Sequence, residues 1–342
     1  MKKSLIALAV LAASGAAMAQ SSVTLYGVVD TGLTYSKGEE SVYGMTHVGG
    51  NVNSRLGFRG VEDLGNGLKA TFNLESGFSA DDGTNYMGQD GLAFTRTSTV
   101  GLAGNFGEVR LGRMLTSSYL AVSRYDAFGD TGIGASLAWN IPQTGYAPRT
   151  ENAISYTSPN FSGFKIGAEY GFGEKQKARD SRYFGMGATY DNGPLSLGLG
   201  YDRLNSNTMD GLLAASDLKT VHLGGAYNFG VAKLLAFYKQ SKVSNAPKFK
   251  TFGLGVSAPV GAAGEVRASY NNYKISDDNG KADQLSLGYV HNLSKRTALY
   301  GTYAYIKNKD GLAFQLNGAM AGAGLKDGEK QHGLQLGVRH AF

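Results

Sequence analysis

The residue types that carry most enzyme chemistry are absent or scattered in this chain. It has no cysteine, which excludes thiolate nucleophiles, disulfides and cysteine-ligated zinc or iron–sulfur centres. The five histidines lie on separate segments, at positions 47, 222, 291, 332 and 340, and no H-E-x-x-H or G-x-S-x-G motif is present. The stretch GLGVSA at 253–258 mimics a dinucleotide fingerprint, but no helix follows it. We therefore expect no enzymatic activity, no cofactor and no metal site.

Charged residues at regular spacing are the remaining chemical signal. Side chains of a strand point to opposite sides in turn, so a basic residue that alternates with bulky apolar residues faces away from them. Five basic residues have this spacing: Arg55, Arg59, Lys69, Arg110 and Lys165. Arg149 and Glu151 have the parity opposite to that of Ile154 and Tyr156, whereas Arg96 shares parity with Val100 and Leu102.

The same alternation extends along almost the whole chain. Fifty glycines, 20 tyrosines and 16 phenylalanines beside one tryptophan favour strands over helices. A mean hydropathy of −0.20 excludes a helical membrane protein. We count roughly sixteen segments of about 9–13 residues, the length with which a tilted strand crosses a bilayer. They lie near 23–35, 54–62, 68–78, 93–103, 107–115, 149–158, 163–173, 181–191, 194–204, 217–229, 231–243, 248–259, 263–275, 281–292, 296–307 and 331–342.

The connections between these segments alternate in length. Short turns such as 63–67 and 191–194 are followed by longer polar loops at 36–53, 79–92, 116–148, 205–216 and 308–330. This alternation is typical of an outer-membrane barrel, with tight periplasmic turns and larger outer loops. A soluble β-sandwich or propeller is the alternative fold, but glycine and charge opposite the bulky residues suit a watery lumen better than a packed core. The prediction is an all-β, 16-stranded transmembrane barrel over residues 20–342.

The first nineteen residues have the pattern of a secretory signal peptide. Lys2 and Lys3 precede an apolar run at 5–13, and Ala17 and Ala19 place small residues before a cleavage site between Ala19 and Gln20. A short buried helix or a membrane anchor is the alternative, but the run is too short to span a bilayer. Removing both lysines lowers the net charge from +6 to +4 (31 basic against 27 acidic residues).

Several long motifs resemble the general porins of β-proteobacteria. They are SVTLYGVVD from Ser22, SRLGFRGVEDLGNGLKA from Ser54, LESGF from Leu74, VGL from Val100, FGEVRLGR from Phe106, NAISYTSPNFSGF from Asn152 and the terminal GVRHAF. The resemblance covers essentially the whole mature chain. It implies a homotrimer in the outer membrane, surrounded by lipid and lipopolysaccharide, whose third outer loop folds into the pore. It also implies that Phe342 is the signal read by the barrel-assembly machinery.

The resemblance further implies a pore constriction with a basic wall and an acidic loop. Its arginines map onto Arg55, Arg96 and Arg149, and the facing acids onto Asp126 and Asp130. Rings of basic side chains favour anions, so we expect a weakly to moderately anion-selective channel for inorganic ions and small hydrophilic solutes. The plainer alternative is that lumen arginines only keep the wall hydrated and pair with Glu62, Glu75 or Glu151.

Other functions fit the sequence less well. A sugar-specific channel would need aromatic residues along the lumen, yet most aromatics here have outward parity, Tyr26 and Tyr300 excepted. A purely adhesive barrel would need fewer strands, since small filled barrels have about eight. Nucleic acid is not an expected partner, because the basic residues are dispersed and +4 is a mild charge.

Overall fold

The computed structural model describes residues 22–47, 49–85, 91–139, 148–173, 182–206, 216–244, 246–276, 280–309, 311–318 and 325–342. The expected signal peptide and its cleavage site at Ala19 and Gln20 lie outside the described residues, so they stay a prediction. Among the described residues, no helix combines the length and the apolar character needed to cross a membrane.

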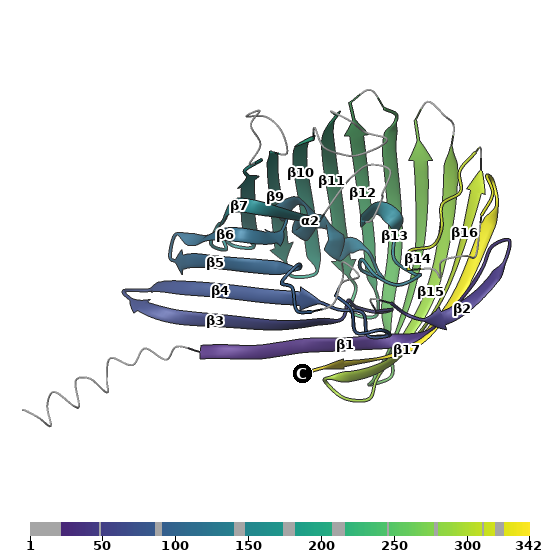
Figure 1. Cartoon of the computed structure of the whole chain (residues 1–342), viewed down its shortest axis with the longest axis horizontal. Coiled ribbons are helices and arrows are strands. Elements are labelled where there is room, and N and C mark those ends of the chain that lie inside the picture. Colours follow the sequence, from purple (N-terminus) through teal and green to yellow (C-terminus); the bar gives the residue numbers. More distant parts are fainter. Residues whose placement is uncertain are drawn as a thin grey trace, which may run out of the picture.

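A single antiparallel sheet closes into a barrel (Figure 1). The strands are β1 Ser22–Lys37, β2 Ser41–Met45, β3 Arg55–Gly65, β4 Leu68–Gly77, β5 Thr97–Gly104, β6 Gly107–Leu115, β7 Arg149–Thr157, β8 Phe164–Gly171, β9 Tyr183–Asn192, β10 Leu195–Ser206, β11 Ser216–Asn228, β12 Lys233–Val243, β13 Lys248–Val260, β14 Gly264–Ile275, β15 Lys281–Asn292, β16 Thr297–Lys309 and β17 Lys330–Ala341. Closure comes from β1, which pairs with β3 on one side and with β17 on the other. Strand β2 pairs with β1 alone, as a hairpin in the first long loop. The wall therefore has the sixteen strands predicted.

Closure removes the sheet edges, whose open hydrogen-bonding groups lipid could not satisfy. The last residue takes part, because the backbone N–H and C=O of Phe342 bond to those of Gly27 on β1, each at 3.1 Å. The ring of Phe342 occupies the space that a side chain on Gly27 would need.

The two faces of the wall differ as the alternation predicts. On β15, Leu285 and Leu287 are 56% and 57% exposed, whereas Gln284 and Ser286, which alternate with them, are buried. The apolar face points outward to lipid and the polar face points inward. On β12 the two adjacent leucines point to opposite faces, since Leu234 is exposed and Leu235 is buried.

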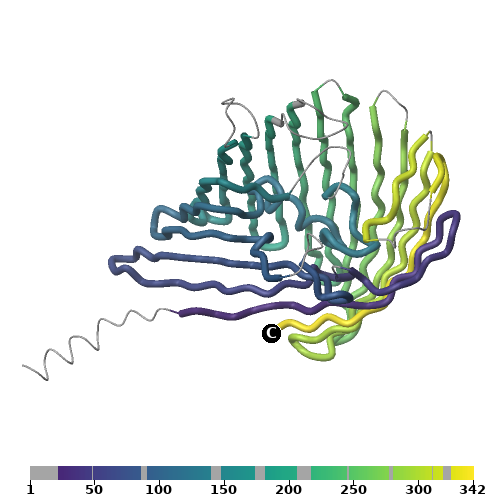
Figure 2. The backbone as a smooth tube through the Cα atoms, in the orientation of Figure 1, coloured from purple at the N-terminus to yellow at the C-terminus, as the bar shows by residue number. Residues whose placement is uncertain are grey.

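The described part of the third loop, residues 116–139, lies against the inner wall (Figure 2). It contains the helix α2 Ser117–Val122 and the 3-10 helices η1 Ser123–Tyr125 and η2 Leu137–Trp139. The helix α2 begins after Thr116, whose hydroxyl accepts from the backbone N–H of Tyr119. Side chains of this loop, among them Tyr125 and Trp139, form an apolar cluster with inward residues such as Leu235 and Phe237.

Glycines give this loop its path along the wall. A Cβ added at any of six inward positions would collide with a loop residue; the six, which we call the glycine track, are Gly187, Gly198, Gly200, Gly224, Gly255 and Gly288. At Gly200 the added atom would lie 2.8 Å from the Cα of Ser118, and at Gly255 it would lie 2.8 Å from the Cβ of Ala127. The backbone of the loop therefore contacts the wall more closely than any larger residue would permit.

Candidate functional site: a charged constriction

The basic side of the candidate constriction is organised by one carboxylate, Glu75 on β4. Its side chain lies 2.6 Å from the Nε of Arg96 and 3.8 Å from the Nε of Arg55. It also accepts a 2.9 Å hydrogen bond from the hydroxyl of Tyr26 on β1. Two of the three predicted constriction arginines, Arg55 and Arg96, thus form ion pairs with Glu75. The alternative that lumen arginines pair with nearby acids predicted this partner.

Arg96 reaches this place because the fourth wall strand starts later than predicted. Strand β5 begins at Thr97 rather than near residue 93, so the parity that Arg96 shares with Val100 does not fix its direction. Its backbone N–H donates to the carbonyl of Glu75 at 3.1 Å. Arg149, at the start of β7, donates from its Nε to the carbonyl of Arg96 at 3.0 Å. The structure therefore brings Arg55, Arg96 and Arg149 into one group.

The third loop presents Asp130 to this group. The carboxylate of Asp130 accepts from the hydroxyl of Tyr119 at 2.6 Å and from the Nδ2 of Asn53 at 3.3 Å. Arg55 donates to the carbonyl of the same Asn53 at 3.4 Å, and Arg149 lies within electrostatic range of Asp130. Burial, reinforced by the charge of Asp130, raises the pKa of Tyr119 well above its ordinary value, so this phenol stays a donor.

Asp126, the second acid expected on the loop, is buried within it. Its carboxylate accepts three hydrogen bonds of 3.0 Å, from the backbone N–H groups of Phe128 and Ser136 and from the Nε1 of Trp139. Burial raises the pKa of Asp126 to about 6, against the opposing effect of these donors. Asp126 therefore holds the loop together, whereas Asp130 is the loop acid that lies beside the three arginines.

The further lumen residues have inward positions at other heights of the wall. The guanidinium of Arg59 lies over the ring of Tyr26, 5.1 Å from its centroid. Arg110 pairs with Glu108 at 3.7 Å. Lys69 and Lys165 are exposed on β4 and β8, opposite Ala103 and Thr189.

Glu151 departs from its predicted inward direction. The pairing of β6 with β7 shifts register between Gly112 and Met114, and Asn152 has a positive φ of 49°. Beyond this irregularity Glu151 is exposed and pairs with Arg113 at 2.8 Å. Because Arg113 lies opposite Ser98, which has the parity of the outward Val100, this ion pair is on the outward side of the wall. Alternation along the strand does not predict side-chain direction across a β-bulge, because the bulge inserts an extra residue.

A second basic group, between the third loop and the wall, was not predicted. Arg124, Lys233, Arg267 and Arg339 line a cavity of about 290 Å³ together with Asp126 and Glu265. Arg267 pairs with Glu265, and Arg339 donates to Asn51 at 2.8 Å. Alternation along β14 and β17 gives Arg267 and Arg339 inward parity, so this signal was present in the sequence.

Comparison with known proteins agrees with this geometry. Residues 5–311 match the family model described as Gram-negative porin. The chain belongs to the Gram-negative porin family. It is 49% identical to outer membrane porin protein 32 of Delftia acidovorans, over the full length of both chains. The structure of the anion-selective porin from Comamonas acidovorans superposes with a TM-score of 0.86 at 46% identity, covering 94% of this chain and all of that one. The trimer form of OmpT from Vibrio cholerae shares only the fold, with a TM-score of 0.70 at 18% identity over 94% of this chain and 99% of that one. This porin is an outer-membrane protein that forms a passive channel.

The third loop of this porin is anchored to the wall by buried polar groups. Asp202 on β10 accepts from the hydroxyl of Ser118 and contacts the Nε2 of His222, both at 2.9 Å. The ring of His222 stacks on Trp139, with 6.2 Å between centroids, and Lys239 donates to the carbonyl of Ala138 at 2.5 Å. These wall residues are far from the loop in sequence, and composition gave no signal that they meet.

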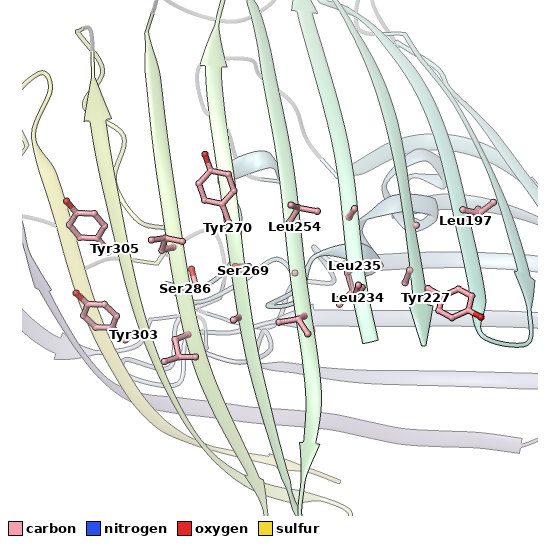
Figure 3. Close-up of a pocket in the computed structure, with 18 of the residues that line it drawn as sticks. Leu197, Tyr227, Leu234, Leu235, Leu254, Ser269, Tyr270, Ser286, Tyr303 and Tyr305 are labelled. Carbon is pink, nitrogen blue, oxygen red and sulfur yellow. The ribbon is translucent and has the colours of Figure 1, made fainter. Parts of the chain in front are cut away.

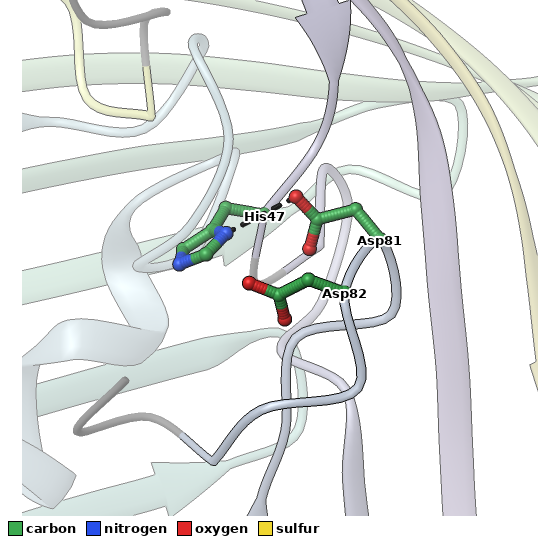
Figure 4. A group of neighbouring side chains, drawn as sticks. All are labelled: His47, Asp81 and Asp82. Carbon is green, nitrogen blue, oxygen red and sulfur yellow. Dashed lines mark hydrogen bonds and ion pairs between the residues drawn. The ribbon is translucent and has the colours of Figure 1, made fainter. Parts of the chain in front are cut away.

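The first two outer loops of this porin meet at an exposed cluster (Figure 4). The Nδ1 of His47 lies 3.1 Å from a carboxylate oxygen of Asp81, and Asp82 is adjacent. Hydrogen bonds from the backbone and side chain of Thr84 lower the pKa of Asp82 below its ordinary value. The cluster therefore joins the two loops by an ion pair when His47 is protonated.

Proposed function

We propose that this porin is a homotrimeric general diffusion channel with a weak to moderate preference for small anions. The observation that carries the proposal is the grouping of Arg55, Arg96 and Arg149 beside a loop that fills part of the lumen. The anion selectivity of the Comamonas porin, 46% identical, supports the same preference.

The physical basis is electrostatic. Clustered cations in a narrow, low-dielectric passage raise the local concentration of anions and repel cations. Asp130 lies across from the arginines, so the two sides produce a transverse field that orders water and disfavours apolar solutes. Glu75 neutralises part of the basic wall, which limits the selectivity to a modest value.

Ion selectivity in planar bilayers tests this proposal. A reversal potential measured in a salt gradient should show anion preference for the wild type and a smaller preference for Arg149→Ala. The matched control is Lys295→Ala, which removes the same charge from an exposed turn at the opposite end of the barrel. Cation preference of the wild type, or equal effects of the two substitutions, would refute the selectivity mechanism.

The remaining parts of the proposal concern partners and turnover. The trimer is supported by the resemblance to porins and by the trimer form of the similarly folded OmpT. The terminal Phe342 is the proposed signal for the barrel-assembly machinery, and lipopolysaccharide is the proposed lipid neighbour. We also propose transport by diffusion without catalysis; hydrolytic turnover by a purified protein that fails to conduct would favour an enzyme instead.

A further inference from the structure

A buried carboxylate lies on the inner side of the wall where the barrel closes. Asp30 on β1 is fully buried, and β1 pairs there with β17 (Figure 1). The hydroxyl of Tyr300 on β16 donates to the Oδ1 of Asp30 at 2.6 Å. A buried charge is costly unless hydrogen bonds compensate it. The groups that donate to Asp30 are therefore held firmly in place.

Three consecutive backbone N–H groups of the first outer loop donate to the same carboxylate. Gly50 donates to Oδ1 at 3.0 Å, whereas Asn51 and Val52 donate to Oδ2 at 3.1 and 2.8 Å. Successive N–H groups that converge in this way form a nest, which binds anions. Here the anion is a side chain of the protein itself, so it fixes the path of residues 49–53. We call these five residues the clamp segment.

Two further contacts hold the clamp segment to the wall. The hydroxyl of Ser54, the next residue, donates to the carbonyl of Asp30 at 2.9 Å and accepts from its backbone N–H at 3.0 Å. Arg339, which lies opposite Asp30 on β17, donates from its Nη1 to the side chain of Asn51 at 2.8 Å. The clamp segment is therefore attached to both strands that close the barrel.

The clamp segment covers the tip of the third loop. The hydroxyl of Thr131 donates to the carbonyl of Gly49 at 3.2 Å, and Thr131 is only 5% exposed. At Gly132 the φ angle is +77°, and an added Cβ would collide with the carbonyl oxygen of Gly50. Only glycine combines this backbone conformation with so close an approach. The tip of the loop is therefore packed directly against the clamp segment.

Asn53 connects the clamp segment to both charged sides of the constriction. Its Nδ2 donates to the Oδ1 of Asp130 at 3.3 Å, and its carbonyl accepts from Arg55 at 3.4 Å. The other carboxylate oxygen of Asp130 accepts from Tyr119, which belongs to the loop. One oxygen of Asp130 is thus held by the loop and the other by the clamp segment. The position of this acid relative to the basic wall depends on both.

We propose that Asp30 is a positioning residue of the channel, which fixes the tip of the third loop through the clamp segment. Asp30 is fully buried, so it acts on the constriction through residues 49–53 and not by contact with solutes. The inference rests on the proposed constriction as the path of ions. It does not depend on whether that path prefers anions.

Cysteine labelling of the loop tip tests this proposal, because the chain has no cysteine of its own. Thr131→Cys places a thiol where a charged methanethiosulfonate reagent reacts only after the tip has left the clamp segment. Adding Asp30→Asn replaces one carboxylate oxygen by an N–H donor, which cannot accept from the backbone N–H groups. Losing one hydrogen bond to a charged acceptor should increase the labelling rate about tenfold.

Two matched controls separate positioning from general loosening of the protein. Ser118→Cys is at the other, fully buried end of the loop, and its labelling rate should be the same with and without Asp30→Asn. Asp283→Asn should leave the labelling of Thr131→Cys unchanged. Asp283 also accepts from a tyrosine hydroxyl, that of Tyr270 at 2.7 Å, but this pair lies on the outward face of the wall (Figure 3).

Single-channel recording gives the functional readout. The current through Asp30→Asn should show sublevels that the wild type lacks, because the loop tip moves within the lumen, whereas Asp283→Asn should conduct steadily. The reversal potential of the wild type tests the anion preference separately. A failure of that preference would therefore leave the positioning role standing, and the reverse also holds.

Three results would overturn the proposal: unchanged labelling of Thr131→Cys, equal acceleration at Ser118→Cys, or a steady current through Asp30→Asn. If Asp30→Asn does not fold, Tyr300→Phe replaces it in every arm. This substitution removes the hydroxyl that donates to Asp30 and lies beside Gly50, and it introduces no new polar group. It should change labelling and current in the same directions, and an unchanged labelling rate would again contradict the proposal.

Discussion

Replacing Glu75 with glutamine should increase the anion preference of the channel. The substitution removes one negative charge between Arg55 and Arg96 but keeps an oxygen that accepts from the Nε of Arg96. The amide nitrogen replaces the other oxygen, which accepts from the hydroxyl of Tyr26. The geometry of the arginines is therefore retained, while their charge is no longer offset. The effect is opposite in sign to that of removing an arginine.

The size of the effect follows from Coulomb's law. A chloride ion passing about 5 Å from the carboxylate experiences about 0.8 kcal/mol in water, which screening at 0.1 M salt lowers to about 0.5 kcal/mol. Removing the charge of Glu75 lowers the energy of a passing anion by about 0.5 kcal/mol and raises that of a cation by the same amount. The ratio of anion to cation permeability should therefore rise about fivefold. At 1 M salt the Debye length falls to about 3 Å, and most of the difference should disappear.

The assay is the reversal potential of single channels across a tenfold salt gradient, centred first on low and then on high ionic strength. Glu62→Gln is the matched control, because Glu62 is an exposed acid near the turn after β3. A channel that conducts is folded, so selectivity is read independently of any loss of stability. An unchanged reversal potential for Glu75→Gln, or a shift equal to that of the control, would show that Glu75 is not in the ion path.

Two further predictions concern the third loop. Gly200→Ala should push α2 about 1 Å from the wall into the lumen, since its Cβ would lie 2.8 Å from the Cα of Ser118; single-channel conductance should fall, whereas Gly225→Ala, on the outward face, should leave it unchanged. Equal conductances would remove the glycine track from the account of the loop. The raised pKa of Asp126 favours its protonated form in the folded loop, so loop stability should be greatest below pH 4 and should decline as pH rises through about 6. Fluorescence of Trp139, the single tryptophan, should report a transition near pH 6 that Asp126→Asn abolishes; a transition that persists in the variant would assign it to another group, such as the stacked His222.

The alternation of apolar and polar residues was sufficient to predict the strands that form the wall of this porin. Side chains alternate in direction along a strand, so apolar and polar residues at alternate positions were sufficient to predict sixteen strands, their outward leucines and the inward positions of Arg55 and Arg59. Loop lengths indicated which strand ends carry the long connections. These features depend on residues that are close in the sequence, so the sequence alone was sufficient to predict them.

Contacts between distant segments were decided only by the tertiary structure. Arg96 lies beside Arg55 and Arg149 because β5 starts at Thr97 and Glu75 lies on the neighbouring strand, whereas Glu151 turns outward because a bulge breaks the alternation. The sequence predicts that Asp126 faces the pore, but its carboxylate is buried and accepts from backbone N–H groups of its own loop. Parity along one strand specifies a side of the wall, but height and partner depend on how all the strands are staggered around the barrel.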